Sequence, residues 1–334
     1  MIQLPLVSVL MPAYNHERFV EEAVKSVWDQ TYKNIELIVV DDGSSDQTLN
    51  ILQKLCAISP ISMKVYTQQN HGVCYTMNKC FEMSHGDWIA GLASDDKYQN
   101  NFIERMIAST KYHPMESTVF HCNAFCIDDR GVMGAKYSAL KSSCPLQGNS
   151  FLSIANRENW IIPGTVFVSR SLHNIVGEWD LSLIAEDFDM LLRLSRVAQF
   201  VYIDEPLFLT RKLHNSLGTQ RRLWINDVFS ALEKHRDFNG IDFNKIITHR
   251  HEIESVLFYS DGDIIRAVHH LLNAIKLRSE LSKKFITFLR VVYLFITATP
   301  RVIIMYVFPI RIIRLTRKYK HRLMTKIKWG LHGI

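Results

Sequence analysis

The first forty residues place a helix-like segment between two apolar runs of strand length. Residues 6–11 and 36–40 are mostly apolar, and each run ends in polar residues. Residues 17–30 between them carry apolar side chains at helical spacing. Strand, helix and strand in this order form the unit of a parallel α/β sheet. Both runs therefore deliver their polar loops to the same edge of the sheet, where open α/β folds bind ligands.

Two pairs of adjacent aspartates follow strand-like runs. Asp41 and Asp42 follow the second run, and Asp95 and Asp96 follow a later apolar run that extends to Ala93. Adjacent acids at the end of a strand suit a hard divalent cation, which takes oxygen ligands and bridges to substrate phosphates. The alternative is a helix N-cap, because Ser and Asp are strongly preferred there.

Several segments in a consistent order resemble the large glycosyltransferase family 2. Residues 7–15, 39–46 and 93–96 resemble its nucleotide-sugar half, residues 177–180 and 185–194 its acceptor half, and residues 207–214 the strand that closes its site. The resemblance covers residues 3 to about 218. It implies an α/β fold of the GT-A type, Rossmann-like, with a mostly parallel sheet and flanking helices. It also implies a divalent metal, an activated nucleotide sugar and an inverting displacement.

The resemblance assigns roles to individual residues of this chain. The residues expected to bind the nucleotide sugar are Pro12, Ala13, Tyr14, Asn15, Glu17, Asp42, Asn70, Gly72, Asn78, Ser94 and Asp95. Tyr14 is expected to lie against the base, and Asp42 to accept a hydrogen bond from the imide N–H of uracil.

The resemblance also implies a metal, an acceptor side and a base. Asp96, with Asp95 and His214, is expected to hold Mn²⁺ or Mg²⁺ at the diphosphate. The residues expected on the acceptor or phosphate side are Glu186, Arg211 and Trp179, and Asp187 is the expected catalytic base. Two positions depart from the common pattern of the family. Ala93 stands where many members carry a further Asp, and Met77 where many carry an Arg.

The chemistry of the expected reaction favours Asp187 as the base. Glu186 and Asp187 open a segment with helical apolar spacing, so they lie at a helix N-terminus, where the dipole is expected to keep a carboxylate ionised. One base without a covalent intermediate leads to inversion. The alternative is simple capping of the helix.

The charge of the chain is divided between its two parts. The net charge is +6, but residues 1–280 carry 27 Lys or Arg and 33 Asp or Glu. Residues 281–334 contain twelve Lys or Arg and no acidic residue. We therefore expect a GT-A domain over residues 1–218, a helical linker region over 219–280, and a basic, apolar tail over 281–334.

The tail combines basic and apolar stripes. Arg290, Pro300, Arg301 and Pro309 interrupt its apolar segments, so no run reaches the about 18 residues of a spanning helix. Basic and apolar stripes side by side are typical of a helix that lies in an anionic membrane surface. The alternatives are a basic helix packed on the catalytic domain, or one that binds nucleic acid.

The sequence thus predicts an inverting glycosyltransferase that moves a sugar from a UDP-sugar to a lipid-linked saccharide in bacterial surface-polysaccharide synthesis, such as O-antigen or capsule. We expect a cytoplasmic protein, peripheral on the inner face of the cytoplasmic membrane. One alternative is a metal-dependent nucleotidyltransferase, but residues 7–18 lack its Gly-rich phosphate loop. The other is a nucleic-acid-binding protein acting through the tail, which the acidic balance of residues 1–280 opposes.

Overall fold

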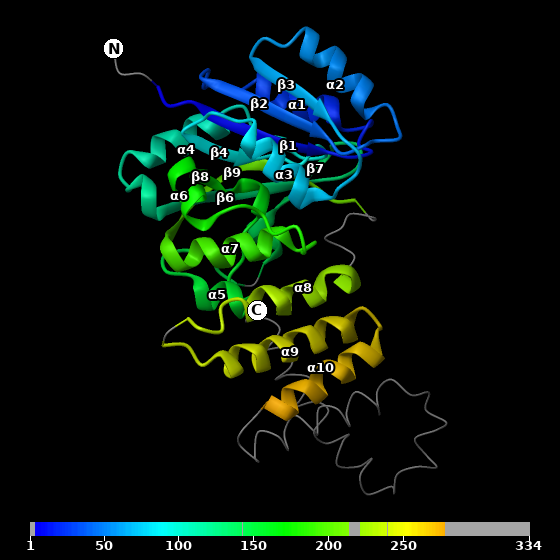
Figure 1. Ribbon diagram of the computed structural model, residues 1–334, viewed down its shortest axis with the longest axis vertical. Coiled ribbons are helices and arrows are strands. Elements are labelled where there is room, and N and C mark those ends of the chain that lie inside the picture. Colours follow the sequence, from blue (N-terminus) through cyan, green and yellow to red (C-terminus); the bar gives the residue numbers. More distant parts are fainter. Residues whose placement is uncertain (1–3, 142, 214–220, 239, 278–334) are drawn as a thin grey trace, which may run out of the picture. The chain divides into compact units, whose positions relative to one another are not determined.

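The computed structural model describes residues 4–141, 143–213, 221–238 and 240–277 (Figure 1). These residues form two compact units. The first unit comprises residues up to Ile154 together with Asn159–Ala231, and the described part of the second comprises Ala155–Glu158 and residues 232–277. The expected boundary near residue 218 stays a prediction, because it falls among residues outside the described ranges.

The first half of unit one is a parallel α/β arrangement. Its strands are β1 (Val7–Ala13), β2 (Ile35–Asp41), β3 (Ser62–Thr67) and β4 (Trp88–Gly91), and its helices are α1 (Val20–Trp28), α2 (Thr48–Ala57) and α3 (Val73–Glu82). The strands pair in parallel in the order β3-β2-β1-β4. The expected strand–helix–strand unit at the start of the chain is therefore confirmed.

The second half continues the same sheet with mixed strand directions. It contains β5 (Lys97–Tyr98), β6 (Thr118–Ile127), β7 (Met133–Lys136), β8 (Phe167–Ser169) and β9 (Gln199–Arg211). The sheet order is β3-β2-β1-β4-β8-β6-β9-β5, with β7 beside β6. Strand β8 runs antiparallel to β4 and β6, whereas β9 is parallel to β6. The expected α/β class is confirmed, and the parallel part of the sheet is followed by a mixed part.

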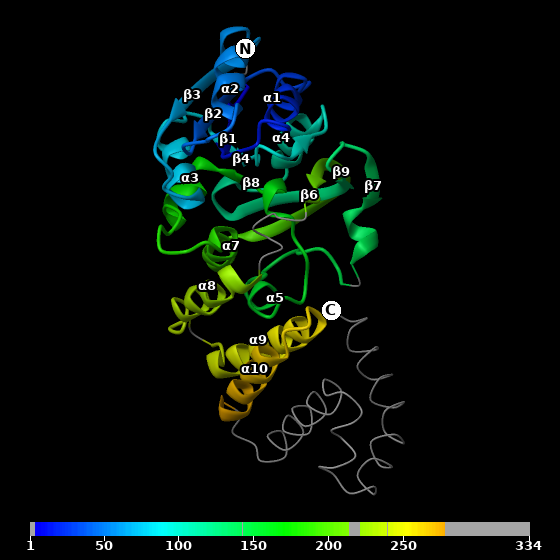
Figure 2. The ribbon, with the colours of Figure 1, turned by 90° about the vertical axis from the view of Figure 1, so that its right-hand side faces the viewer.

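Further helices complete the described chain. They are α4 (Phe102–Thr110), α5 (Phe151–Ala155), α6 (Arg170–Val176), α7 (Glu186–Val197), α8 (Arg221–Glu233), α9 (Phe243–Ser260) and α10 (Ile264–Leu277), with short 3-10 turns at Met115–Ser117, Tyr137–Leu140 and Pro163–Thr165. Helices α1 and α4 lie on one face of the sheet and α3 and α7 on the other (Figure 2). Strands β1 and β2 are buried over almost their whole length because helices cover both faces.

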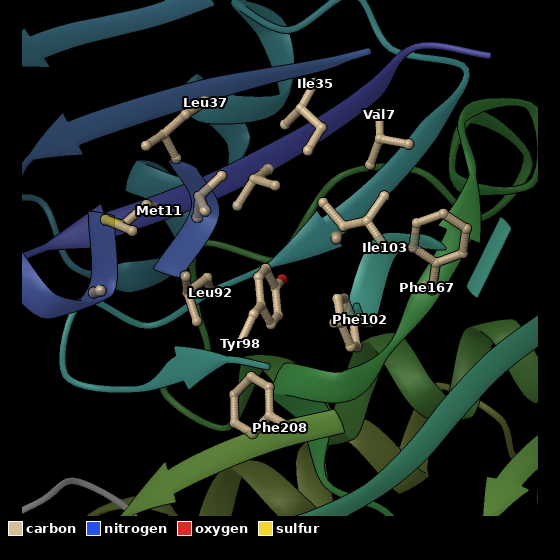
Figure 3. Close-up of a cluster of buried hydrophobic side chains, with 14 of the residues drawn as sticks. Val7, Met11, Ile35, Leu37, Leu92, Tyr98, Phe102, Ile103, Phe167 and Phe208 are labelled. Carbon is tan, nitrogen blue, oxygen red and sulfur yellow. The ribbon is translucent and has the colours of Figure 1, made fainter. Parts of the chain in front are cut away.

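The core on the α1 side fixes where β4 ends (Figure 3). Tyr98 stacks on Phe102 with ring centroids 4.1 Å apart and meets Phe208 edge-on at 5.7 Å. The Tyr98 hydroxyl donates a hydrogen bond of 2.8 Å to the carbonyl of Gly91. Strands β4, β5 and β9 are thereby tied together on both sides of the loop that carries Asp95 and Asp96.

The second unit is helical, as expected for the region after the catalytic half. Within it, the buried carboxylate of Glu254 pairs with Arg250 at 3.0 Å and with Arg157 at 3.9 Å. Among the described residues, no helix is both long enough and apolar enough to cross a membrane. The basic tail over residues 281–334 lies outside the described ranges, so its expected place on a membrane surface stays a prediction.

Candidate active site

The loops after β1 and β2 meet at one edge of the sheet. Ala13 and Asp41 are register partners, and the amide of Asp42 donates a 2.8 Å hydrogen bond to the carbonyl of Ala13. Ala13 and Asp42 are both buried. The sequence-based prediction that these strands deliver their loops to a common edge is therefore confirmed.

The carboxylate of Asp42 organises the loop before α3. Its Oδ1 accepts hydrogen bonds from Gln68 Nε2 at 2.8 Å and from the amide of His71 at 2.9 Å, and its Oδ2 accepts from the amide of Gly72 at 2.9 Å. Gly72 has a φ of +87°, a conformation that favours glycine. Asn70 lies in the same loop. Recognition of uracil by Asp42 stays a prediction, in which Oδ2 has acceptor capacity left.

Asn15 and Glu17 hold a second loop at this edge. Asn15 Oδ1 accepts a hydrogen bond from the amide of Ser45 at 2.8 Å, and Glu17 Oε2 accepts one from the amide of Gln47 at 2.9 Å. Directly before Asn15, Tyr14 leaves 48% of its surface exposed. Asn15 and Glu17 thus hold the loops beside an exposed tyrosine, and stacking of Tyr14 on a base stays a prediction.

The acidic loop after β4 is fixed from two sides. Ser94 Oγ shares a 2.7 Å hydrogen bond with His16 Nδ1, and Asp96 Oδ1 accepts one of 2.6 Å from the amide of Arg211. Among the described residues, Oδ2 of Asp96 accepts no hydrogen bond. That free oxygen beside Asp95 fits one or two sites in the coordination shell of a divalent cation.

Arg211 does not take the expected position at the phosphates. Its Nε donates to the carbonyl of Asp95 at 2.8 Å, its Nη1 to the carbonyl of Asp128 at 2.8 Å, and its Nη2 pairs with Glu22 at 3.1 Å. The guanidinium also lies over the ring of Phe19, 4.6 Å from its centroid, and the residue is only 5% exposed. The side chain is consumed inside the fold, so Arg211 braces the acidic loop instead of contacting phosphate.

Asn78 also differs from its expected role in binding the nucleotide sugar. Its Nδ2 donates a 2.8 Å hydrogen bond to the carbonyl of Trp179, and its Oδ1 accepts one of 2.8 Å from the amide of Trp179. Both ends of the amide are therefore paired with one main-chain residue. Asn78 ties α3 to the segment that carries Trp179, and this replaces the expected contact with the donor sugar.

A cavity of about 440 Å³ lies between β4 and β8 on one side and α3 and α7 on the other. Five of the predicted site residues line it: Pro12, Asp96, Trp179, Glu186 and Asp187. The expected metal ligand at the end of β4 and the expected base at the start of α7 are therefore brought to one cavity. Most of the remaining lining is apolar.

The carboxyl groups of this cavity have raised pKa values. Burial and the neighbouring Asp95 raise the pKa of Asp96 to about 8. Burial raises the pKa of Asp187 to about 6, and burial together with Asp187 raises that of Glu186 well above its ordinary value. Desolvation thus outweighs the helix dipole in setting the pKa of Asp187, although a pKa near 6 still leaves this carboxylate mostly ionised at neutral pH. A carboxylate with a pKa near 6 is a better base at neutral pH than an ordinary aspartate.

The start of α7 is anchored by a residue that sequence analysis missed. The N-cap residue, Ala185, offers no side-chain cap. Instead, Asp227 Oδ2 on α8 accepts hydrogen bonds from the amides of Ile184 at 2.5 Å and of Ala185 at 3.2 Å. Asp227 therefore fixes the turn directly before Glu186 and Asp187. No local pattern around residue 227 signals this role, because its partners lie more than forty residues earlier.

The described residues contain no group of three His, Cys, Asp or Glu side chains that could hold a metal ion. His214, the third expected ligand, lies outside the described ranges. The acids at hand are Asp95 and Asp96, which match a cation that takes its other ligands from a diphosphate and water. The predicted metal site therefore stays a prediction. Its two carboxylate ligands, Asp95 and Asp96, are placed together in this loop.

Comparison with known sequences identifies the chain's relatives. Residues 8–160 match the model of the family described as "Glycosyl transferase family 2". The chain is 28% identical over 239 residues to an uncharacterized glycosyltransferase of Rickettsia prowazekii, RP339, covering 71% of each chain. It is 40% identical over 103 residues to TuaG of Bacillus subtilis, which carries the name of a teichuronic acid biosynthesis glycosyltransferase; this covers 31% of the chain and 41% of TuaG.

Solved structures share the fold. A crystal structure of Staphylococcus aureus TarS 1–349 in complex with UDP-GlcNAc superimposes with a TM-score of 0.60 at 18% identity, covering 81% of each chain. The mannosyltransferase PcManGT of Pyrobaculum calidifontis, in complex with GDP-Man and Mn²⁺, superimposes with a TM-score of 0.56 at 15% identity, covering 88% of this chain and 81% of that one. The fold is therefore of the GT-A type.

Proposed function

This chain belongs to glycosyltransferase family 2, and on that premise we propose that it transfers a sugar from a UDP-sugar to a lipid-linked saccharide with inversion. An α-linked donor then gives a β-linked product. Because the chain belongs to this family, we no longer retain the alternative that it is a metal-dependent nucleotidyltransferase. The observation that carries the proposal is that Asp96 and Asp187 line the same cavity.

Asp96 and Asp187 have different tasks in this cavity. Asp96 lies in the loop between β4 and β5, and Asp187 lies in the first turn of α7. A displacement at an anomeric carbon needs charge stabilisation on the leaving diphosphate and a base near the attacking hydroxyl. Both acids line the cavity of about 440 Å³, which offers the space that a sugar would occupy.

A divalent cation is the proposed partner of Asp95 and Asp96. The free Oδ2 of Asp96 supports this, and so does PcManGT, a structure of the same fold that was solved with Mn²⁺. A bound Mn²⁺ or Mg²⁺ supplies positive charge that stabilises the departing diphosphate. Asp96 itself is held in place by the amide of Arg211, so the chain presents this carboxylate in a fixed position.

Asp187 is the proposed base. Its carboxylate accepts the proton of the acceptor hydroxyl as that oxygen attacks the anomeric carbon, on the face opposite the leaving diphosphate. The bond from the sugar to the diphosphate breaks in the same displacement. Asp227 keeps the turn before Asp187 in position during this step.

UDP is the proposed nucleotide. The support comes from Asp42, whose Oδ2 retains acceptor capacity, from the exposed ring of Tyr14, and from TarS, which was solved with UDP-GlcNAc. An imide N–H of uracil matches such an acceptor. Guanine also offers N–H donors, so the expected preference for UDP depends on the larger size of guanine in a pocket built around Tyr14. UDP should therefore compete with the donor more strongly than GDP does.

A membrane-bound acceptor is proposed from the charge of the tail. Residues 281–334 contain twelve Lys or Arg and no acid, which suits an anionic cytoplasmic membrane surface. The name of the relative TuaG places it in the synthesis of a bacterial polysaccharide. We place this chain in a comparable surface-polysaccharide pathway, peripheral on the inner face of the membrane.

A donor screen tests the function. UDP-, GDP- and dTDP-sugars are offered with lipid-linked and short soluble acceptors, and release of the nucleoside diphosphate is measured with and without Mn²⁺. We expect acceptor-dependent release of UDP. Acceptor-dependent release of GDP alone would remove the UDP assignment, and release without any acceptor dependence would remove the proposed transfer.

A further inference from the structure

The cavity extends well beyond the acidic residues. On α7 it is lined by Asp187, Met190, Leu191 and Leu194, which lie on one face of the helix. Seven residues of helix rise about 10 Å, so Leu194 lies that far along the axis from Asp187. We call the part of the cavity around Leu194 its deep end. It is separate from the acidic residues that the proposed reaction uses.

The lining residues on β4, β8 and α3 also show that the cavity extends beyond the acidic residues. Ile89 and Gly91 point to one face of β4, and Ile89 is the register partner of Val168 on β8; all three residues line the cavity. The cavity thus runs from the acidic end of β4 back along the sheet. On α3, the lining residues Val73 and Met77 precede Phe81 by two turns and one turn.

His173 lies at this deep end. Its ring stacks on Phe81 with centroids 3.9 Å apart and packs against Trp179 at 4.7 Å and 48°. Phe81 covers one face of the imidazole and Trp179 packs against the ring at a tilt, so an edge of the ring is what remains to meet the cavity. The residue lines the cavity but is only 2% exposed.

Both ring nitrogens of His173 are buried without a hydrogen-bond partner in the described part of the chain. Burial, with Arg193 and Arg170 nearby, lowers the pKa of His173 to about 4, so the ring is neutral near pH 7. A neutral imidazole offers one N–H donor and one acceptor nitrogen. A buried donor and acceptor left without partners are costly, so a ligand that reaches these nitrogens from the cavity would gain from pairing with them.

The surroundings of His173 restrict what that ligand can be. The nearby lining is aliphatic, with Ile89, Val168 and Leu194. A hydroxyl group fits poorly, because it would leave the aliphatic wall without an apolar partner. An acetamido group fits both parts, since its amide offers a donor and an acceptor while its methyl group contacts the aliphatic wall.

We infer that the deep end of this cavity binds the acetamido group of the donor, so that the donor is a UDP-N-acetylhexosamine. This inference rests on the proposed transfer from a UDP-sugar. With its anomeric carbon between Asp96 and Asp187, a hexose would extend its acetamido arm towards the residues that line the cavity about 10 Å further along α7. His173 is then a specificity-determining residue that pairs with the amide.

The test compares donors and variants. For the wild-type chain we expect kcat/KM to favour UDP-GlcNAc or UDP-GalNAc over UDP-Glc and UDP-Gal by about 10-fold or more. His173→Phe keeps the aromatic stack and removes both nitrogens, so this preference should fall towards unity. His121→Phe is the matched control, because His121 is also a buried histidine with an unpartnered nitrogen but does not line the cavity. It should keep the wild-type preference.

A second variant tests the same site in case His173→Phe does not fold. Leu194→Phe fills the deep end and leaves His173 in place, and it should also reduce the preference; thermal unfolding reports whether each variant folds. Equal or better use of UDP-Glc and UDP-Gal by the wild type would overturn the acetamido site and leave the proposed function intact. A preference that survives in both folded variants would overturn the role of His173. Turnover with GDP- or dTDP-sugars only would overturn the proposed function itself.

Discussion

The main-chain amide of Arg211 donates a hydrogen bond of 2.6 Å to Oδ1 of Asp96, across 115 positions of sequence. Strand β9 therefore sets the position of the acid at the end of β4. The guanidinium of the same arginine holds the carbonyl of Asp95. One residue thus braces both members of the acidic pair, with its main chain and its side chain, and presents Asp96 to the cavity.

We expect Asp96→Ala to weaken binding of the UDP-sugar at least about 10-fold in the presence of Mn²⁺, because the ion loses a fixed oxygen ligand. Calorimetric titration of donor with and without metal measures this. Asp129→Asn is the control, since Asp129 makes an exposed ion pair with Arg18. Full activity of the wild type after exhaustive chelation would contradict a metal at this loop.

The pH dependence of turnover should report Asp187. Only the ionised carboxylate accepts a proton, and burial raises the pKa of Asp187 to about 6. With saturating Mn²⁺, which would keep Asp96 ionised, activity should therefore be constant above the pKa of Asp187 and fall about tenfold per pH unit below it. The measurement is kcat/KM from pH 4.5 to 8 with a soluble acceptor. An acidic limb near pH 4 would indicate that the base has an ordinary aspartate pKa.

Removal of the anchor at α7 should lower turnover more than donor binding. Asp227→Ala deprives the amides of Ile184 and Ala185 of their acceptor, so we expect kcat to fall roughly tenfold with little change in the KM of the donor. Asp227→Asn keeps one acceptor oxygen and should recover part of the loss. Asp29→Ala, at an exposed position after α1, serves as the control. Equal losses in kcat and donor affinity would point to general unfolding.

Removal of residues 284–334 should release the protein from membranes. Each basic residue near an anionic surface contributes on the order of 1 kcal/mol, and the tail carries many of them. We expect sedimentation with anionic vesicles to be lost, while turnover on a soluble acceptor persists. Vesicle binding by the truncated chain equal to that of the full chain would contradict the anchor.

Local patterns predicted much of this fold and part of this site. The spacing of apolar side chains along residues 6–40 is a local property of the sequence, so β1, α1 and β2 were predictable. The roles of Asp96 and Asp187 came from the resemblance to a family, and the structure adds that both residues line one cavity. Arg211 was misassigned because a cation after a strand carries no local sign of the buried partners that take up its guanidinium.

Other features depend on distant contacts. Asp227 acts through amides that lie on a different segment, and the pairing of Asn78 with Trp179 depends on the approach of α3 to that segment. The pKa of Asp187 depends on how much protein surrounds it, and this outweighs the helix terminus that the sequence does indicate. Such properties need the fold before they can be predicted.

The most direct test of the account is the turnover of Asp187→Asn with a competent UDP-sugar and acceptor. The amide keeps the shape of the side chain and cannot accept the proton of the attacking hydroxyl. We predict that kcat falls by roughly two to four orders of magnitude. Affinity for the UDP-sugar, measured in parallel by calorimetry, should stay within about threefold of wild type. Turnover near the wild-type rate would contradict the assignment of Asp187 as the base, and with it the proposed inverting mechanism.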